Sequence, residues 1–415
     1  MEVKVRRVEG YIVFDSRGSP TIEVSITSER GFRGRFASPS GKSVGKYEAP
    51  PLPKDGILGA KKIVDEANKY FHNFSFSTQA EFDDAIKRFD GGPRYERIGT
   101  IVSLGLSFAA ADLASNEGGI PMYKWIGGDI KPIFPIPICN VLGGGKHALN
   151  RSIDIQEILV FPLNARSYRD AYTSTLEVYR KVSELLSDRD MFFTGGRNDE
   201  GAWVTTLTDE EAFDIVWDSV DRVRSEVGVK FGVGIDMASS SLWDVESKVY
   251  VYRRSGVNRD REEQIEYVID LVKKHNIQYV EDPLHEDDFP GFSYIRKRLG
   301  NKVLVVGDDL YVTNISRIKL GISERAGNAV IIKPNQVGDV STTFQASKSA
   351  SEGGFKVVVS HRSGETHYPH LAHLALAVEA DMFKVSPVYG ERVIKHNELL
   401  LIEDLYGSRG VKRIW

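Results

Sequence analysis

The stretch VVVSHRSGE (Val357–Glu365) combines two kinds of sequence that rarely share one structural element. Its three valines are β-branched and apolar, which predicts a short buried strand. A serine, a histidine, an arginine and a second serine follow without a break (Ser360–Ser363), and such side chains are uncommon in a core. Polar residues at the end of a buried strand indicate a ligand site, and the ends of the other strands test that interpretation.

Other apolar segments of the chain also end in a charged residue. In chain order, these residues are Asp236, Glu281, Asp308, Lys333 and Lys384. The intervals between them suit successive strand and helix units. In a closed barrel of such units the carboxyl ends of the strands meet at one mouth, where the active site lies. We therefore expect these side chains to lie close to one another and to the polar segment Ser360–Ser363.

The C-terminal two thirds of the chain alternate between apolar strand candidates and amphipathic stretches such as SYRDAYTSTLEVYRKVSELL (167–186). Repeated units of this kind predict a parallel sheet, and a closed eight-stranded barrel fits a length of about 270 residues best. The N-terminal quarter differs. There TIEVSIT (21–27) and GFRGRF (31–36) alternate apolar and polar residues around a turn, which predicts an antiparallel hairpin. From Ile57 onward apolar residues recur every three to four positions, which predicts helices.

These patterns predict an α/β protein of two domains. We expect an N-terminal α+β domain over residues 1–125 and a C-terminal eight-stranded (β/α) barrel over residues 138–415. Between them the segment IGGDIKPIFPIP (126–137) is rich in proline and glycine, which is typical of a linker.

The composition excludes several classes of function. The 54 basic and 58 acidic side chains are well mixed and give a net charge of −4, which argues against a nucleic-acid-binding face. A single cysteine, Cys139, excludes an internal disulfide and a cysteine-rich zinc site. The start of the chain does not have the pattern of a signal peptide, and no apolar run is long enough for a membrane span. We expect a soluble, cytoplasmic protein.

The charged strand ends also indicate a metal. Three carboxylates that converge on one mouth would repel one another by about 4 kcal/mol per pair at about 4 Å, so a cation must offset them. A ligand set of oxygen atoms suits a hard cation such as Mg²⁺. Lys333 and Lys384 would face that metal. A lysine acts as a general base when its pKa falls toward about 7 to 8, and nearby cations shift the pKa in that direction.

Three loops contain further candidate residues, and each also has an ordinary structural explanation. SPSGKSVGKYEAP (38–50) lacks the spacing of a phosphate-binding Walker loop and fits either a surface loop or a lid that approaches an anion. NVLGGGKHALN (140–150) contains His147, which alone could simply be solvated. GRNDEGAW (196–203) contains Asp199 and Glu200, which alone would fit a charged surface loop.

Taken together, these segments resemble the enolase family, Mg²⁺-dependent lyases that interconvert 2-phosphoglycerate and phosphoenolpyruvate. SHRSGET, VEDPLHEDD and GDDLYVTN are nearly identical to the signature segments of the family, and IIKPNQVG and NVLGGGKHA are similar to them. The similarity extends from DSRGSPTIEV near the start to ERVIKHNELLLIEDL near the end. It implies an N-terminal α+β domain packed on a barrel whose first units depart from regular strand–helix alternation.

The resemblance also implies roles for individual residues. Asp236, Glu281 and Asp308 would bind a first Mg²⁺, which also holds the substrate carboxylate. Lys333 would remove the proton from C2, and Glu200 would be the acid that assists departure of the C3 hydroxyl. Supporting groups around Glu200 would be Glu157, Gln156 and His147, of which Gln156 also reaches the substrate.

The remaining implied residues bind substrate or a second ion. Arg362 and Ser363 would bind the phosphate, and Lys384 would contact the substrate carboxylate. His361 would line the site. Ser43 would help to hold a second Mg²⁺, which gives two ions per active site. The family resemblance further implies a homodimer or an octamer.

The sequence departs from the family pattern in three places. NDEGAWVT stands where the family has GDEGG followed by an aromatic residue, alanine and proline, so the loop of Glu200 is altered. KVSPV replaces KTGAP after the last strand. Lys42 and Val44 replace the usual alanine and threonine, and a lysine beside a phosphate would tighten binding. These changes bear on rate or substrate preference more than on the class of reaction.

The resemblance and the charged positions favour an enolase, a carbon–oxygen lyase. One alternative is a relative that removes the α-proton of another carboxylic acid. Another is Schiff-base chemistry on Lys333 or Lys384, against which the three carboxylates argue. A third is a noncatalytic protein of the same fold, because fold alone does not determine function.

Overall fold

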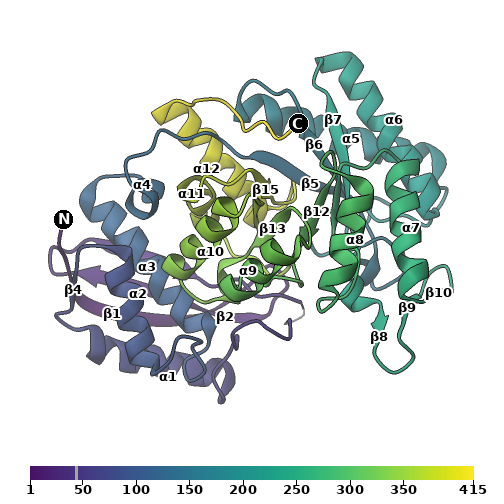
Figure 1. Cartoon of the computed structure of the whole chain (residues 1–415). Helices are drawn as coiled ribbons and strands as arrows, with labels where there is room; N and C mark the ends of the chain where they lie inside the picture. The colour runs from purple at the N-terminus through teal and green to yellow at the C-terminus, as the bar shows by residue number, and fades with distance from the viewer. Residues whose placement is uncertain (43–44) are drawn as a thin grey trace.

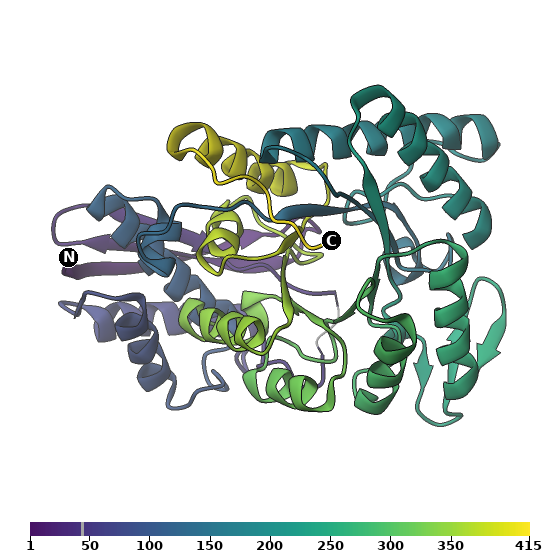
Figure 2. The ribbon, with the colours of Figure 1, turned by 45° about the horizontal axis from the view of Figure 1, so that its top comes forward.

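The computed structural model describes residues 1–42 and 45–415 and contains the two expected kinds of domain. An α+β domain precedes a closed barrel of eight strands. In Figures 1 and 2 the N-terminal sheet and its helices form one end of the molecule and the barrel forms the other. The last residue, Trp415, stacks on Phe161 of the barrel with ring centroids 5.1 Å apart, so the C-terminus is packed against the barrel.

The N-terminal sheet has the strand order β3-β2-β1-β4. Its strands are β1 (Val3–Phe14), β2 (Pro20–Ser28), β3 (Arg33–Ala37) and β4 (Ser75–Phe76). The predicted hairpin is confirmed as β2 and β3, which pair antiparallel. Strand β1 was not predicted, because two adjacent arginines interrupt its alternation where the register with β2 shifts between Val5 and Arg7.

Four helices cover this sheet and connect it to the barrel. They are α1 (Gly56–Phe71), α2 (Gln79–Asp90), α3 (Thr100–Gly118) and α4 (Met122–Gly127). The apolar stripe predicted from Ile57 is largely buried in α1, although Tyr70 at its end is exposed. Helix α3 is apolar on nearly all sides and is buried along most of its length, because it contacts both the sheet and elements of the barrel.

The barrel strands follow in the order β11-β12-β13-β14-β15-β5-β6-β7 around the ring. Their bounds are β5 (Ile136–Gly143), β6 (Glu157–Pro162), β7 (Phe231–Asp236), β11 (Tyr279–Glu281), β12 (Leu304–Gly307), β13 (Ala329–Ile332), β14 (Lys356–Ser360) and β15 (Met382–Lys384). Apolar side chains from these strands fill the interior, among them Phe161, Tyr279 and Met382. The barrel is therefore a packed core with its functional groups at one end.

The expectation of a purely parallel sheet from strand–helix alternation is wrong for one strand. Strand β6 runs antiparallel to both β5 and β7, as the family resemblance to an irregular barrel allowed. A loop leads from β5 directly into β6, so the chain reverses. Two helices, α5 (Tyr168–Arg189) and α6 (Asp209–Val227), then separate β6 from β7. This helix pair returns the chain to the end of the barrel at which β6 finishes. Strand β7 therefore runs in the direction opposite to β6.

The remaining helices surround the barrel, as Figure 2 shows. They are α7 (Arg261–Lys274), α8 (Phe289–Leu299), α9 (Ile315–Glu324), α10 (Val340–Glu352), α11 (His370–Ala377) and α12 (Gly390–Tyr406). Strands β8 (Trp243–Asp244), β9 (Val249–Tyr252) and β10 (Val257–Arg259) form a small separate sheet. Short 3₁₀ helices span Gly145–Ala148, Ser239–Ser241 and Pro334–Gln336.

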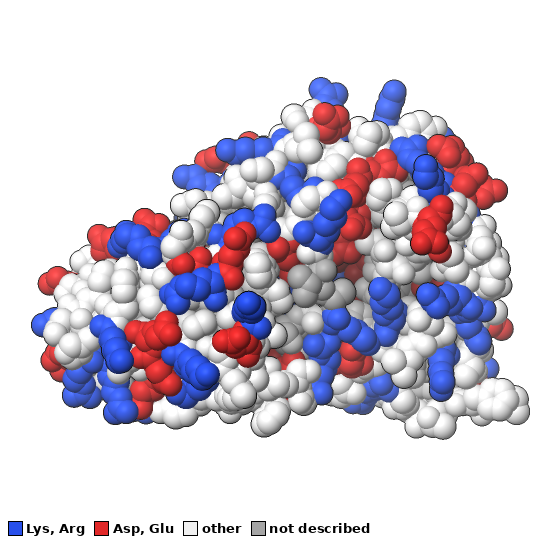
Figure 3. Space-filling model, turned by 90° about the horizontal axis from the view of Figure 1, so that it is seen from below, with Lys and Arg blue, Asp and Glu red and all other residues white. Residues whose placement is uncertain are grey.

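Surface charge and hydropathy agree with the composition. On the face shown in Figure 3, basic and acidic side chains of the described residues are interspersed. Within residues 1–42 and 45–415, no helix combines the length and the apolar character that crossing a membrane requires.

Candidate active site

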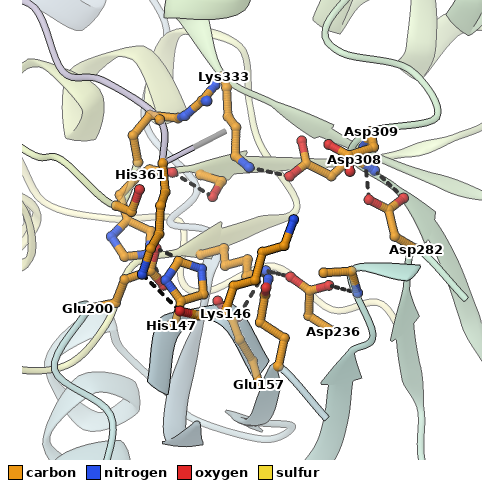
Figure 4. Close-up of a pocket in the computed structure, with 18 of the residues that line it drawn as sticks. Lys146, His147, Glu157, Glu200, Asp236, Asp282, Asp308, Asp309, Lys333 and His361 are labelled. Carbon is orange, nitrogen blue, oxygen red and sulfur yellow. Dashed lines mark hydrogen bonds and ion pairs between the residues drawn. The ribbon is translucent and has the colours of Figure 1, made fainter. Parts of the chain in front are cut away.

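A cavity of about 160 Å³ opens at the mouth of the barrel, and nearly all the residues implied by the sequence surround it. The predicted residues that line it are His147, Gln156, Glu157, Glu200, Asp236, Asp308, Lys333, His361, Arg362, Ser363 and Lys384. Glu281 lies fully buried beside the cavity. Ser43 falls outside the described residues. Figure 4 shows His147, Glu200 and His361 on one side of the cavity, and Asp236, Asp282, Asp308 and Asp309 on the other.

Three carboxylates form one row across neighbouring strands. Glu157 pairs with Asp236 between β6 and β7, and Asp236 pairs with Glu281 between β7 and β11. Glu157 begins its strand whereas the other two end theirs. Because β6 is reversed, its first residue lies at the same mouth as the last residues of its neighbours. The unexpected strand direction thus completes the row.

Lys384 neutralises part of this row. Its Nζ donates to Asp236 Oδ2 at 3.0 Å and to Glu281 Oε1 at 2.8 Å, and it lies 3.0 Å from Glu157 Oε2. Burial alone lowers the pKa of the Lys384 ammonium, but the three carboxylates outweigh it and hold that pKa well above its usual value. The pKa of Glu281 is raised by burial and by the neighbouring Asp236.

Lys333 contacts Asp308 at the ends of β13 and β12. The Nζ of Lys333 donates to Asp308 Oδ2, and Gln336 Nε2 donates to Asp308 Oδ1 at 3.3 Å. Burial lowers the pKa of Lys333, but the attraction of Asp308 outweighs it, so the pKa is raised. The fall expected beside a metal ion therefore does not come from the protein groups. A carboxylate, and not a cation, lies nearest to the ammonium.

The cavity wall beside Asp308 contains two acids that the sequence analysis did not single out, Asp282 and Asp309. Oxygen atoms of Asp282, Asp308 and Asp309 all lie within 4.8 Å of one another. Asp282 accepts the backbone N–H groups of Asp308 and Asp309 at 2.9 Å each, which fixes the chain just past β12. Burial, followed by repulsion from Asp308, raises the pKa of Asp309 to about 7.

This arrangement fits a hard cation. The carboxylates of Asp236, Glu281 and Asp308 are buried, and all the ligand atoms they offer are oxygen. Burial raises the pKa values of Glu281 and Asp282, and repulsion from neighbouring carboxylates raises them further. A divalent cation would relieve that repulsion, as the enolase resemblance implies.

The opposite side of the cavity is a linked set of acids around His147. The ring Nδ1 of His147 lies 2.7 Å from Asp199 Oδ1, and its Nε2 lies 3.7 Å from Glu200 Oε1. Burial lowers the pKa of His147, but Glu200 and Asp199 outweigh it and raise that pKa to about 9. The imidazole is therefore positively charged at neutral pH and faces Glu200.

Glu157 and Glu200 are buried beside each other and titrate as a pair. Burial raises the pKa of Glu157, Lys384 opposes that rise and the charge of Glu200 adds to it, and together they bring the pKa to about 8. Burial also disfavours the charged form of Glu200, but His147 and His361 outweigh it and lower the Glu200 pKa. The pair therefore shares one proton at neutral pH.

The altered loop before Glu200 has its own internal support. Asn198 Oδ1 accepts the backbone N–H groups of both Glu200 and Ala202 at 3.0 Å. Trp203 stacks on Tyr179 with centroids 4.9 Å apart and donates its Nε1–H to the Tyr179 carbonyl at 3.0 Å. The changed residues thus hold Glu200 against the cavity. Lys384, the first residue of the changed KVSPV segment, also lines the cavity.

The polar segment that ends β14 meets groups from distant parts of the chain. Arg362 Nη1 lies 3.4 Å from Glu48 Oε2 and donates to Asn335 Oδ1 at 3.2 Å. Arg17 Nη1 donates to Ser363 Oγ at 3.3 Å. Arg17 was not assigned a role from the sequence, although the quoted DSRGSPTIEV segment contains it. The two residues in this contact are 346 positions apart, so no pattern of neighbouring residues in the sequence indicates it.

Lys42 lies on the side of the cavity that contains His147 and Glu200. Its Nζ donates to the Lys146 carbonyl at 2.8 Å and to Asp199 Oδ2 at 3.1 Å. The groups that Lys42 contacts thus belong to the loops that carry His147 and Glu200.

Comparisons with known proteins agree with this geometry. A model of the enolase N-terminal domain matches residues 5–126, and a model of the enolase C-terminal TIM barrel domain matches residues 131–412. The chain is 38% identical over 407 residues to an enolase of Methanosphaera stadtmanae, covering 97% of this chain and 96% of that protein. It is 40% identical over 406 residues to an enolase of Pyrobaculum aerophilum, with 95% of each covered. An enolase of Archaeoglobus fulgidus is 41% identical over 401 residues, with 97% of each covered. On these similarities, which span both domains, the chain belongs to the enolase family.

Proposed function

We propose that the cavity at the barrel mouth carries out the reversible dehydration of 2-phosphoglycerate to phosphoenolpyruvate, a carbon–oxygen lyase reaction of glycolysis and gluconeogenesis. The observation that carries this proposal is the placement of a basic lysine and an acid on different sides of one cavity. Lys333 lies beside Asp308, and Glu200 lies beside His147. Removal of a proton from one carbon and loss of a hydroxyl from the next require such a pair.

Lys333 removes the C2 proton. Its side chain is partly buried directly after a barrel strand, so it approaches the substrate from a fixed direction. To act as a base it must first release its own proton, and its contact with Asp308 opposes that release. A cation on Asp308 would weaken this attraction and lower the pKa of Lys333.

Glu200 delivers a proton to the leaving C3 hydroxyl, which departs as water. The proton comes from the Glu157–Glu200 pair, which holds one proton at neutral pH. His147, fixed by Asp199, orients Glu200 and compensates its charge after the transfer. Proton removal at C2 and cleavage of the C3–O bond together form the double bond of the product.

The remaining groups orient the substrate. Arg362 and Ser363 bind the phosphate, because a guanidinium and a hydroxyl at a strand end offer charge-assisted hydrogen bonds to its oxygens. Lys384 contacts the carboxylate end, above the row of acids. Gln156 and His361 complete the lining between these two ends.

Asp236, Glu281 and Asp308 would hold Mg²⁺, with Asp282 and Asp309 beside them. The bound ion supplies positive charge where negative charge develops on the substrate carboxylate. We propose two ions per site, the second with Ser43 as a ligand.

We also propose a boundary at residues 126–137 between domains 1–125 and 138–415. A cytoplasmic location and a homodimer or octamer are further proposals. They rest on the family and on the frequency of twofold assemblies.

The test is the ultraviolet absorbance of the purified protein with 2-phosphoglycerate. A rise that depends on Mg²⁺ and disappears with a chelator is expected, because phosphoenolpyruvate has a conjugated double bond. A folded, metal-loaded protein that gives no rise would refute this substrate assignment, and other 2-substituted acids would then be assayed.

A further inference from the structure

Among residues 1–42 and 45–415, Arg392, near the start of α12, is the largest fully buried side chain, with an exposure of 0%. Burying a guanidinium costs several kcal/mol unless hydrogen bonds replace its water shell. The structure therefore has to provide acceptors for this group. Which acceptors it provides indicates what the arginine does.

Arg392 donates to two separate loops of the active site. Its Nε donates to the Glu200 carbonyl at 3.1 Å, and its Nη2 lies within 3.3 Å of the Asp199 carbonyl. The same Nη2 donates to the Ser363 carbonyl at 3.1 Å. One guanidinium thus contacts the main chain of the proposed acid and of the proposed phosphate ligand.

The remaining nitrogen contacts a residue of the same helix. Arg392 Nη1 donates to Glu391 Oε1 at 3.0 Å, which balances part of the charge. One turn further along α12, Lys395 Nζ donates to the Thr366 carbonyl at 2.9 Å. The first turns of α12 therefore hold the segment that follows β14 at more than one point.

The shape of the side chain matters for this arrangement. A guanidinium presents five N–H donors in one rigid plane, so it can fix the angle as well as the distance between two loops. A lysine ammonium at the same place would keep the charge but would not span all three carbonyls.

From these contacts we propose that Arg392 is a positioning residue, which fixes the main chain of Glu200 relative to that of Ser363. The acid then lies next to the C3 hydroxyl of a substrate whose phosphate is bound at Ser363. This inference rests on the proposed function. Arg392 acts through the main chain of its partners. Lys333, directly after β13, is held by different contacts, so removal of the C2 proton depends on Arg392 less than cleavage of the C3–O bond does.

The two chemical steps can be measured separately in Arg392→Gln and Arg392→Lys. Exchange of the C2 proton of 2-phosphoglycerate with deuterium from solvent follows the first step, and absorbance of phosphoenolpyruvate follows both. A displacement of about 1 Å at a catalytic group can lower the rate by about 100-fold. We expect Arg392→Gln to lower kcat for dehydration by about that factor, with a loss of exchange below about 10-fold. Arg392→Lys should recover part of the lost kcat.

Arg261→Lys is the matched control. Two nitrogens of Arg261 donate to the two oxygens of Asp288, at 2.7 and 2.9 Å, and a lysine would lose this two-point geometry here as well. It lies outside the cavity lining, so its variant should lose stability without separating dehydration from exchange.

Equal losses of exchange and dehydration in Arg392→Lys, or a kcat within about twofold of wild type in Arg392→Gln, would overturn the positioning role. If Arg392→Gln does not fold, the split between the two rates in Arg392→Lys decides the question. A wild-type protein without dehydration activity would instead refute the proposed function, and this inference with it.

Discussion

The side-chain oxygen of Asn198 accepts the backbone N–H of Glu200 at 3.0 Å, two residues further along the same loop. The same atom accepts the N–H of Ala202, so one amide closes the turn that carries the acid. Asn198 belongs to the segment in which this chain departs from the usual sequence of its family. The departure therefore provides a local means of fixing Glu200.

Asn198→Ala should impair catalysis more than it impairs folding. The variant leaves two buried N–H groups without an acceptor, at about 1–3 kcal/mol each if they stay buried, and the loop would shift to avoid that cost. We expect kcat to fall by about 100-fold because Glu200 moves. Asn116→Ala, which removes an exposed side-chain bond to the Arg33 carbonyl, is the control. Steady-state kinetics with kcat within about threefold of wild type would contradict this account.

Lys333→Ala should abolish exchange of the C2 proton with solvent while Mg²⁺ still binds. Loss of a general base lowers the rate by about 10²- to 10⁴-fold. Nuclear magnetic resonance follows the exchange, and calorimetry follows metal binding. Lys356→Ala is a suitable comparison, because Lys356 begins the adjacent strand β14 and pairs with Asp381 far from the mouth. Persistent exchange in Lys333→Ala would exclude Lys333 as the base.

Asp308→Asn should raise the Mg²⁺ concentration needed for half-maximal activity by at least about 10-fold, because a carboxylate ligand is replaced by a neutral amide. It also removes the negative charge that pairs with Lys333, so kcat should fall. Asp218→Asn, which breaks a surface pair with Arg189, should leave the Mg²⁺ dependence unchanged. An unchanged dependence in Asp308→Asn would remove this residue from the ligand set.

Acid should destabilise the protein through His370. Burial holds the pKa of this imidazole at about 3, where it stacks on Phe36 and contacts the Arg35 carbonyl at 2.9 Å. An unfolded histidine has a pKa near 6.5. Between these values the unfolded chain binds a proton that the folded chain does not, so the free energy of unfolding decreases as the pH falls from about 6.5 to 3.

For one such histidine, that decrease is about 2 kcal/mol between pH 7 and pH 5. Urea unfolding at both values should therefore show a smaller decrease in His370→Gln than in wild type, although the variant is less stable at pH 7. His72→Gln removes an exposed histidine that also contacts a backbone carbonyl, and it should follow the wild-type dependence. The same pH dependence in His370→Gln and wild type would rule out this contribution.

The local pattern of the sequence predicted much of the barrel. Apolar runs ending in Asp236, Lys333 or Lys384 identified the strands and their functional ends, because side-chain burial and strand length are properties of neighbouring residues. The direction of β6 was not predictable in this way. It depends on the helix pair α5 and α6, and it places Glu157 at the mouth although Glu157 begins its strand.

The sequence by itself determined the family, the charged strand ends and the expectation of a hard metal ion, because these depend on residue type and on short motifs. Only the tertiary structure decided which groups contact one another. It placed Lys384 among the carboxylate row, Lys42 beside Asp199, and Arg392 against the carbonyls of Glu200 and Ser363. These contacts join segments far apart in the chain. Their geometry follows from how whole strands and helices pack, so no local pattern of residues specifies it.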